Sequence, residues 1–68
     1  MEIKINTEFI TLAQMLKMAD IVQSGGEAKY AVKELNIEVN GQAENRRGRK
    51  LYVGDVVFVD GDHYTIAE

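Results

Sequence analysis

The sequence predicts an α+β fold with an N-terminal strand, two packed helices and then a small antiparallel sheet. Three observations lead to this expectation. Apolar and polar residues alternate at the start of the chain, two stretches of helical periodicity follow, and the later part carries two dipeptides typical of tight hairpin turns. The 68 residues allow a single domain, spanning 1–68, which buries only about 60% of the surface that its unfolded chain exposes.

The first two elements are a strand at residues 2 to 6 and a helix from about 11 to 19. Met1, Ile3 and Ile5 fall on one face of an extended segment. Thr11 and Gln14 have the spacing of a capping box, in which each side chain bonds the backbone N–H of the other residue. Apolar residues then recur at helical spacing, namely Leu12, Met15, Leu16 and Ala19.

A second helix is expected from about 25 to 35. Ser24 and Glu27 form a second capping-box pair. The stripe that follows consists of Ala28, Ala31, Val32 and Leu35. The link from Asp20 to Gln23 is short, so the two helices should be neighbours in space.

The later part of the chain should form two hairpins. Ile37 and Val39 alternate with Glu38, and Asn40-Gly41 suits the positive φ angles of a tight turn. Val56 to Val59 is typical of a buried strand, Asp60-Gly61 of a second tight turn, and His63 to Ala67 of the returning strand. The core should contain Leu12, Met15, Leu16, Ala19, Ala31, Val32, Leu35, Ile37, Val39, Leu51 and Val57.

The net charge of −3 conceals a separation of charge along the chain. All eight basic residues lie within positions 1 to 50, whereas positions 51 to 68 hold four acids and no base. Four of the bases, Arg46, Arg47, Arg49 and Lys50, form one run around Gly48. We expect this run on a loop beside the first hairpin, where phosphates relieve the repulsion between the cations. The alternative is a solvated loop without a ligand.

Two features of the second helix could extend this basic surface. Lys29 and Lys33 are four residues apart and share one helix face, although pairing with Glu27 or Glu34 is the plainer interpretation. Ser24-Gly25-Gly26 opens the helix with free N–H groups and little steric bulk, which suits a phosphate. The alternative there is a cap and turn without a ligand.

Catalysis, metal binding and cofactor binding have no support in the sequence. His63 is the single histidine and lies in an acidic hairpin, where we interpret it as a surface turn residue. Cysteine is absent, and no activated nucleophile or pair of carboxylates on one helix face is present. The chain also lacks a signal-peptide pattern and any apolar run of about 18 residues, so we expect a cytoplasmic protein without membrane contact.

The aromatic residues give little support for base-specific recognition. The three tyrosines and two phenylalanines are scattered along the chain, which predicts core and edge positions instead of a stacking platform. Recognition of structured RNA by shape and backbone is the better hypothesis.

Several motifs follow one another in a definite order: Thr11 to Asp20, Ser24 to Lys29, Ile37 to Gly41, Arg46 to Leu51, and Gly54-Asp55. This succession, over roughly residues 8 to 60, resembles the S4-like (alpha-L) RNA-binding domain. It most resembles the small stand-alone bacterial version, the YaaA family.

The resemblance implies a compact, non-catalytic module in which the helical pair and the following hairpin form one basic surface for structured RNA, with ribosomal RNA or ribosome-assembly particles as the expected partner. We also expect the chain to be a monomer. The implied contact residues are Lys17, Ser24, Gly25, Gly26, Lys29, Lys33, Asn40, Gly41, Arg46, Arg47, Arg49 and Lys50. One departure concerns Gly25, because many S4-like domains have Arg directly after the capping Ser. A contact at this helix start is therefore expected to run through the backbone.

A second hypothesis of a different class is a protein-interaction adaptor. Its docking element would be the acidic C-terminal hairpin, Asp55 to Glu68, while the basic run would only aid solubility. Salt dependence separates the two, because RNA affinity falls steeply with ionic strength and an apolar protein interface is much less sensitive.

Overall fold

The computed structural model describes all residues, 1–68, as two helices, a five-stranded sheet and a two-stranded sheet. This arrangement confirms the predicted α+β class. The helices are α1 (Leu12–Met18) and α2 (Gly25–Glu34). The strands are β1 (Glu2–Lys4), β2 (Ile10–Thr11), β3 (Ile37–Val39), β4 (Gln42–Ala43), β5 (Lys50–Leu51), β6 (Val56–Val59) and β7 (Asp62–Ala67).

Both helices begin where the sequence predicts, but only α1 has a complete capping box. Thr11 Oγ1 accepts from the N–H of Gln14 at 3.2 Å, and Gln14 Oε1 accepts from the N–H of Thr11 at 2.8 Å. At α2, Ser24 Oγ accepts from the N–H of Glu27, but the Glu27 carboxylate accepts from Gln23, one residue before the cap. The second predicted box is therefore only half formed.

The larger sheet has the strand order β1-β7-β6-β3-β4. Both predicted turns are confirmed, since Asn40 and Gly41 have φ angles of 53° and 84°, and Asp60 and Gly61 have 48° and 100°. The predicted N-terminal strand also forms, but it pairs in parallel with β7 and joins the same sheet. A parallel partner at the other end of the chain leaves no local signal in the sequence.

The small sheet formed by β2 and β5 was not predicted. Ile10 pairs with Leu51 and Thr11 with Lys50, in antiparallel register. Strands of two residues are too short to produce a periodic pattern in the sequence. The pairing places the end of the basic run directly beside the start of α1.

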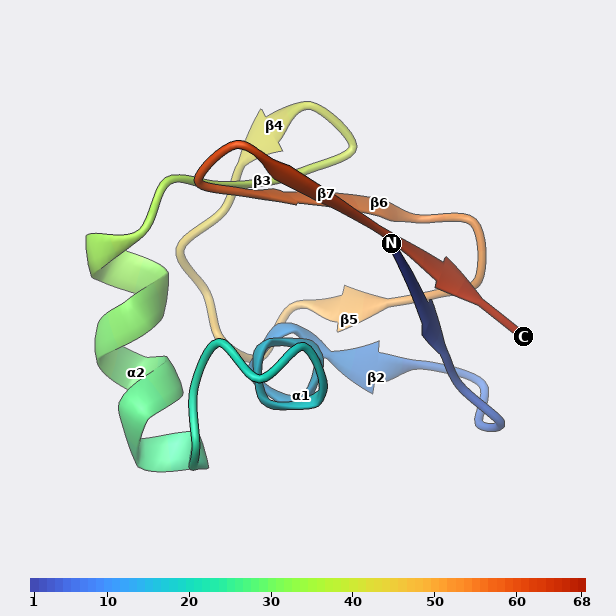
Figure 1. Cartoon of the computed structure of the whole chain (residues 1–68), viewed down its shortest axis with the longest axis horizontal. Helices are drawn as coiled ribbons and strands as arrows, with labels where there is room; N and C mark the ends of the chain where they lie inside the picture. Colours follow the sequence, from blue (N-terminus) through green and yellow to red (C-terminus); the bar gives the residue numbers. More distant parts are fainter.

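The core lies between the five-stranded sheet and a layer made of α1 and the β2–β5 pair, with α2 along one side (Figure 1). Eight of the predicted core residues are buried, whereas Ala19, Ala31 and Leu35 are only partly buried at its edge. Val56 was expected to be buried but is 36% exposed, because β6 buries only one face. Residues absent from the predicted list also enter the core: Ile3, Ile5, Ile10, Val22, Ala28, Val59, Tyr64 and Ile66. No helix of the structure has the length and apolarity needed to span a membrane.

Candidate nucleic-acid interface

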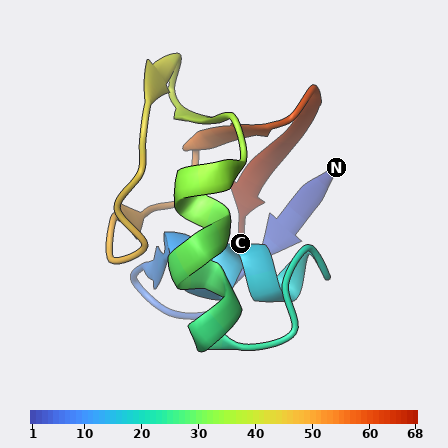
Figure 2. The ribbon, with the colours of Figure 1, turned by 90° about the vertical axis from the view of Figure 1, so that its left-hand side faces the viewer.

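Residues 46–50, here called the basic loop, follow β4 and run into β5, whose first residue is Lys50, and they lie beside the N-terminal end of α1 (Figure 2). The carbonyl of Arg49 accepts from the N–H of Leu12 at 2.8 Å, and the carbonyl of Arg47 accepts from the N–H of Ala13 at 2.9 Å. The first N–H groups of a helix have no partner within the helix, so these bonds satisfy groups that need an external acceptor. The loop backbone and the start of α1 therefore hold each other in place.

The side chains of the basic loop are organised by the buried carboxylate of Glu44, which belongs to none of the sequence motifs described above. The Glu44 side chain is only 5% exposed. Its Oε2 accepts from Arg46 Nε and its Oε1 from Arg49 Nη1, both at 2.8 Å. Arg46 also donates to this carboxylate through Nη2 and its backbone N–H. Two guanidinium groups are thus held by one acid.

This finding corrects the interpretation of the basic run as a group of cations whose repulsion only an external anion relieves. Glu44 lies two residues before the run, so the run itself contains no acid, but the fold turns the carboxylate back toward it. Arg46 and Arg49 are already paired. Phosphates that bind here must therefore add to an existing ion-pair network.

The ion pairs keep Glu44 charged. The hydrogen bond from the Arg46 side chain is the main cause that lowers the pKa of Glu44 from 4.5 to about 2. Bonds from Arg49 and from the Arg46 backbone act in the same direction, while burial opposes them. The same hydrogen bond raises the pKa of Arg46. Glu44 is therefore ionised at neutral pH, and the four basic residues of the loop outnumber this one acid.

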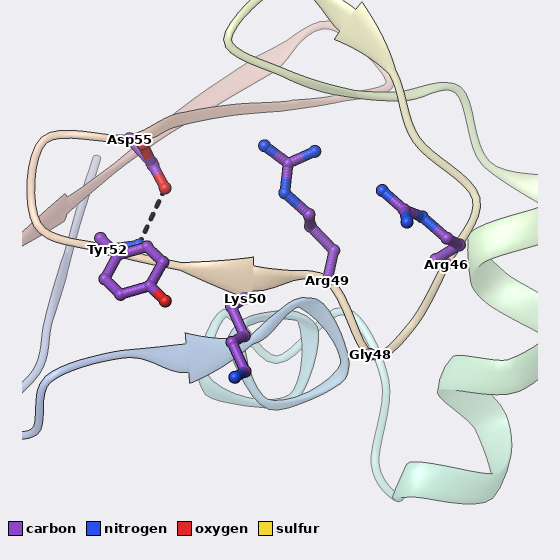
Figure 3. Close-up of a pocket in the computed structure, with 6 residues that line it drawn as sticks. All are labelled: Arg46, Gly48, Arg49, Lys50, Tyr52 and Asp55. Atoms are coloured by element: carbon purple, nitrogen blue, oxygen red, sulfur yellow. Dashed lines mark hydrogen bonds between the residues drawn. The ribbon is translucent and has the colours of Figure 1, made fainter.

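Arg47 and Lys50 are the cations of the basic loop that form no ion pair. Both side chains are exposed, and Lys50 places its Nζ 4.8 Å from the centre of the Phe9 ring. Figure 3 shows Arg49 and Lys50 pointing to opposite sides of β5. The basic loop therefore offers cations on two sides, with Arg47 and Lys50 the most available for a polyanion.

Two hollows lie next to the basic loop. One of about 540 Å³ is lined by Arg46, Gly48, Arg49, Lys50, Tyr52 and Asp55 (Figure 3). The other, of about 260 Å³, lies between the C-terminal end of α2 and the segment after β4, and its lining includes Lys33, Glu44 and Asn45. Lys33 thus lies near the carboxylate that holds the arginines, as the predicted surface requires.

Lys29 and Lys33 are both exposed, and neither pairs with Glu27 or Glu34. The simpler interpretation of these lysines, that each forms an ion pair with a glutamate of the same helix, is therefore wrong. Because the two side chains are one helical turn apart, Lys29 continues the exposed positive charge along α2 from Lys33.

The other predicted contact residues do not gather around the basic loop. Ser24, Gly25 and Gly26 are exposed at the N-terminal end of α2, whereas the Asn40-Gly41 turn lies at the opposite end of the molecule (Figure 1). Lys17 is in the last turn of α1, and the basic loop contacts the first turn. The fold divides the predicted residues between at least three places.

Asn40 has a structural role that its sequence motif did not reveal. Its Oδ1 accepts from the N–H of Val56 at 2.9 Å, and its Nδ2 donates to Asp55 Oδ1 at 3.1 Å. Both ends of the side-chain amide are therefore engaged within the fold. The side chain joins the turn after β3 to the start of β6.

The acidic C-terminal hairpin is largely integrated into the sheet. Strands β6 and β7 are both interior strands, each hydrogen-bonded on two sides. Asp55 Oδ2 accepts from the N–H of Tyr52 and Asp60 Oδ1 from the N–H of Asn36, both at 2.8 Å. Two of the carboxylates that would attract a basic partner are thus occupied in holding turns. This weakens the adaptor hypothesis.

Comparison with known proteins shows what this chain is similar to. The model of a family described as S4 domain matches residues 3–67. The chain is 59% identical over 59 residues to the probable ribosome maturation protein RlbA of Bacillus subtilis (strain 168). That alignment covers 87% of this chain and 83% of the relative.

Proposed function

This chain belongs to the S4 domain family, and we therefore propose that it binds structured RNA through the basic loop without catalysing a reaction. The relative from Bacillus subtilis bears the name of a probable ribosome maturation protein. We extend that role to this chain, with ribosomal RNA or an assembly intermediate of the ribosome as the partner.

The observation that carries the proposal is the preorganisation of the basic loop. Its carbonyls are bonded to α1, and Glu44 fixes two of its guanidinium groups. Cations that are already positioned lose less conformational freedom when they bind phosphates. In a chain with a net charge of −3, this fixed group of cations is the natural contact for an RNA backbone.

The proposed contact surface is centred on Arg46, Arg47, Arg49 and Lys50, with Lys29 and Lys33 on α2 as its extension. An RNA that extends well beyond the basic loop is needed to reach the remaining predicted contact residues, which are Lys17, Ser24, Gly25, Gly26, Asn40 and Gly41. We propose them as secondary contacts.

The test is a titration of an RNA hairpin at several salt concentrations. If about four phosphates are neutralised, log affinity should fall against log salt with a slope of the order of −3 to −4. Arg47→Gln should flatten this slope by nearly 1. Lys4→Gln removes the same charge from β1, outside the proposed surface, and should leave the slope unchanged. Equal affinities and slopes for the wild type and Arg47→Gln would contradict the assignment of RNA binding to this loop.

The same titration addresses the adaptor hypothesis. Complete absence of salt-dependent RNA binding would remove the proposed function and favour a protein partner. Specificity among sequences should change little in Arg47→Gln, because phosphate contacts position a protein without reading bases.

A further inference from the structure

The hollow beside the basic loop is lined by one aromatic side chain among mostly charged ones. Tyr52 is 43% exposed and is the single aromatic residue that lines the hollow. Figure 3 shows Tyr52 and Asp55 at one end of the hollow, Arg46 at the other end and Arg49 between them. Tyr52 and the two arginines that bind Glu44 therefore line the same hollow.

The position of Tyr52 is fixed from two directions. Its N–H donates to Asp55 Oδ2 at 2.8 Å. Its ring packs against that of Phe9, with 5.8 Å between the ring centres and 50° between the planes. Phe9 is in turn covered by Lys50 Nζ at 4.8 Å. The fold thus brings together two aromatic residues that are 43 positions apart in the sequence.

The two ends of the hollow differ in charge. The carboxylate of Asp55 lies at the tyrosine end and disfavours a phosphate there, while Arg46 and Arg49 favour one at the other end. A nucleotide has the matching asymmetry, with a flat uncharged base joined to an anionic phosphate. A paired stem alone presents phosphates but keeps the faces of its bases inside the helix.

We propose that the hollow receives one unpaired nucleotide of the bound RNA, with its base stacked on Tyr52 and its phosphate at Arg46 and Arg49. This inference rests on the proposed function and adds a preference for RNA that contains a bulged or looped-out nucleotide. Aromatic stacking accepts any base, so the site distinguishes unpaired from paired RNA without reading the sequence.

The test compares two RNA hairpins of the same stem sequence, one fully paired and one with a single bulged 2-aminopurine. Wild-type protein should bind the bulged hairpin more tightly and quench the fluorescence of the 2-aminopurine. Tyr52→Leu should lose roughly 5- to 150-fold in affinity for the bulged hairpin and change little on the paired one. Tyr52→Phe should retain both the preference and the quenching.

Tyr30→Leu is the matched control, because Tyr30 is 67% exposed on α2 and does not line the hollow. It should behave like the wild type. Equal wild-type affinity for the two hairpins, or no quenching, would overturn the stacking site even if Tyr52→Leu fails to fold. In that case salt-dependent binding of both hairpins would leave the proposed function intact, whereas no binding of either hairpin would remove the proposed function itself.

Discussion

Arg49 Nη1 donates to Glu44 Oε1 at 2.8 Å, and this contact joins the most buried acid of the chain to the basic loop. The carboxylate of Glu44 reduces the total positive charge of the basic surface. It also fixes where the remaining charge lies, because Arg46 binds the same carboxylate. The arginines supply most of the positive charge of the basic loop, and Glu44 fixes where two of their guanidinium groups lie.

Glu44→Gln should weaken RNA binding even though it makes the chain more positive. The amide cannot balance two guanidinium groups, so the arginines repel each other and lose their fixed positions. The free energy of unfolding should fall by about 1–3 kcal/mol. Denaturant titration and RNA titration measure the two effects. Glu2→Gln, an exposed acid on β1, is the control for charge alone. Tighter RNA binding by Glu44→Gln would show that only net charge matters.

The stability of the protein should fall in acid through Glu44. The pKa of this group is lowered from 4.5 to about 2 in the folded state, so its contribution is complete above about pH 4.5 and disappears as the pH falls toward 2. Unfolding free energies of the wild type and Glu44→Gln should therefore converge between these values. A difference that stays constant from pH 6 to pH 2 would contradict the assigned ion pairs.

Arg47→Gln and Arg49→Gln should have different effects although they remove the same charge. Arg47 forms no ion pair, so its replacement should change the unfolding free energy by less than about 0.5 kcal/mol and mainly flatten the salt slope. Arg49 holds a buried carboxylate, and its replacement should cost about 1–3 kcal/mol. Equal losses of stability in the two variants would be inconsistent with the structure.

Gly48→Ala should preserve the fold and reduce RNA affinity. A Cβ at Gly48 meets no atom within 4 Å, and its φ is not positive, so the fold does not require glycine there. Any requirement for glycine must come from close approach of the RNA backbone. Gly41→Ala is the contrasting variant, because its φ of 84° should cost about 1 kcal/mol. Thermal melting and RNA titration of both variants check this, and unchanged RNA affinity in Gly48→Ala would exclude close contact at the loop.

Leu16→Ala should cost roughly 2 to 5 kcal/mol of stability, because Leu16 is fully buried where α1 meets the core. A domain of this size can lose its fold with such a change. Met18→Ala on the same helix is the control, since Met18 is 49% exposed and should matter little. Similar melting temperatures for both variants would argue against the observed packing of α1.

The sequence alone determined the features that depend on neighbouring residues. The caps at Thr11 and Ser24 locate the helix starts, and the two Asx-Gly dipeptides locate both tight turns, because each signal lies within four residues of its effect. The order of the motifs was sufficient to predict the family. The positive charge of the basic run was also evident.

Only the tertiary structure decided how the candidate site is assembled. The ion pairs of Glu44, the bonds from the basic loop to α1 and the contact between Phe9 and Tyr52 all depend on where separate segments meet. The tertiary structure also decided that the Asn40-Gly41 turn and the start of α2 lie far apart (Figure 1). Local propensity specifies helices and turns, but contacts between distant segments follow from burying one shared core, which no short stretch of sequence encodes.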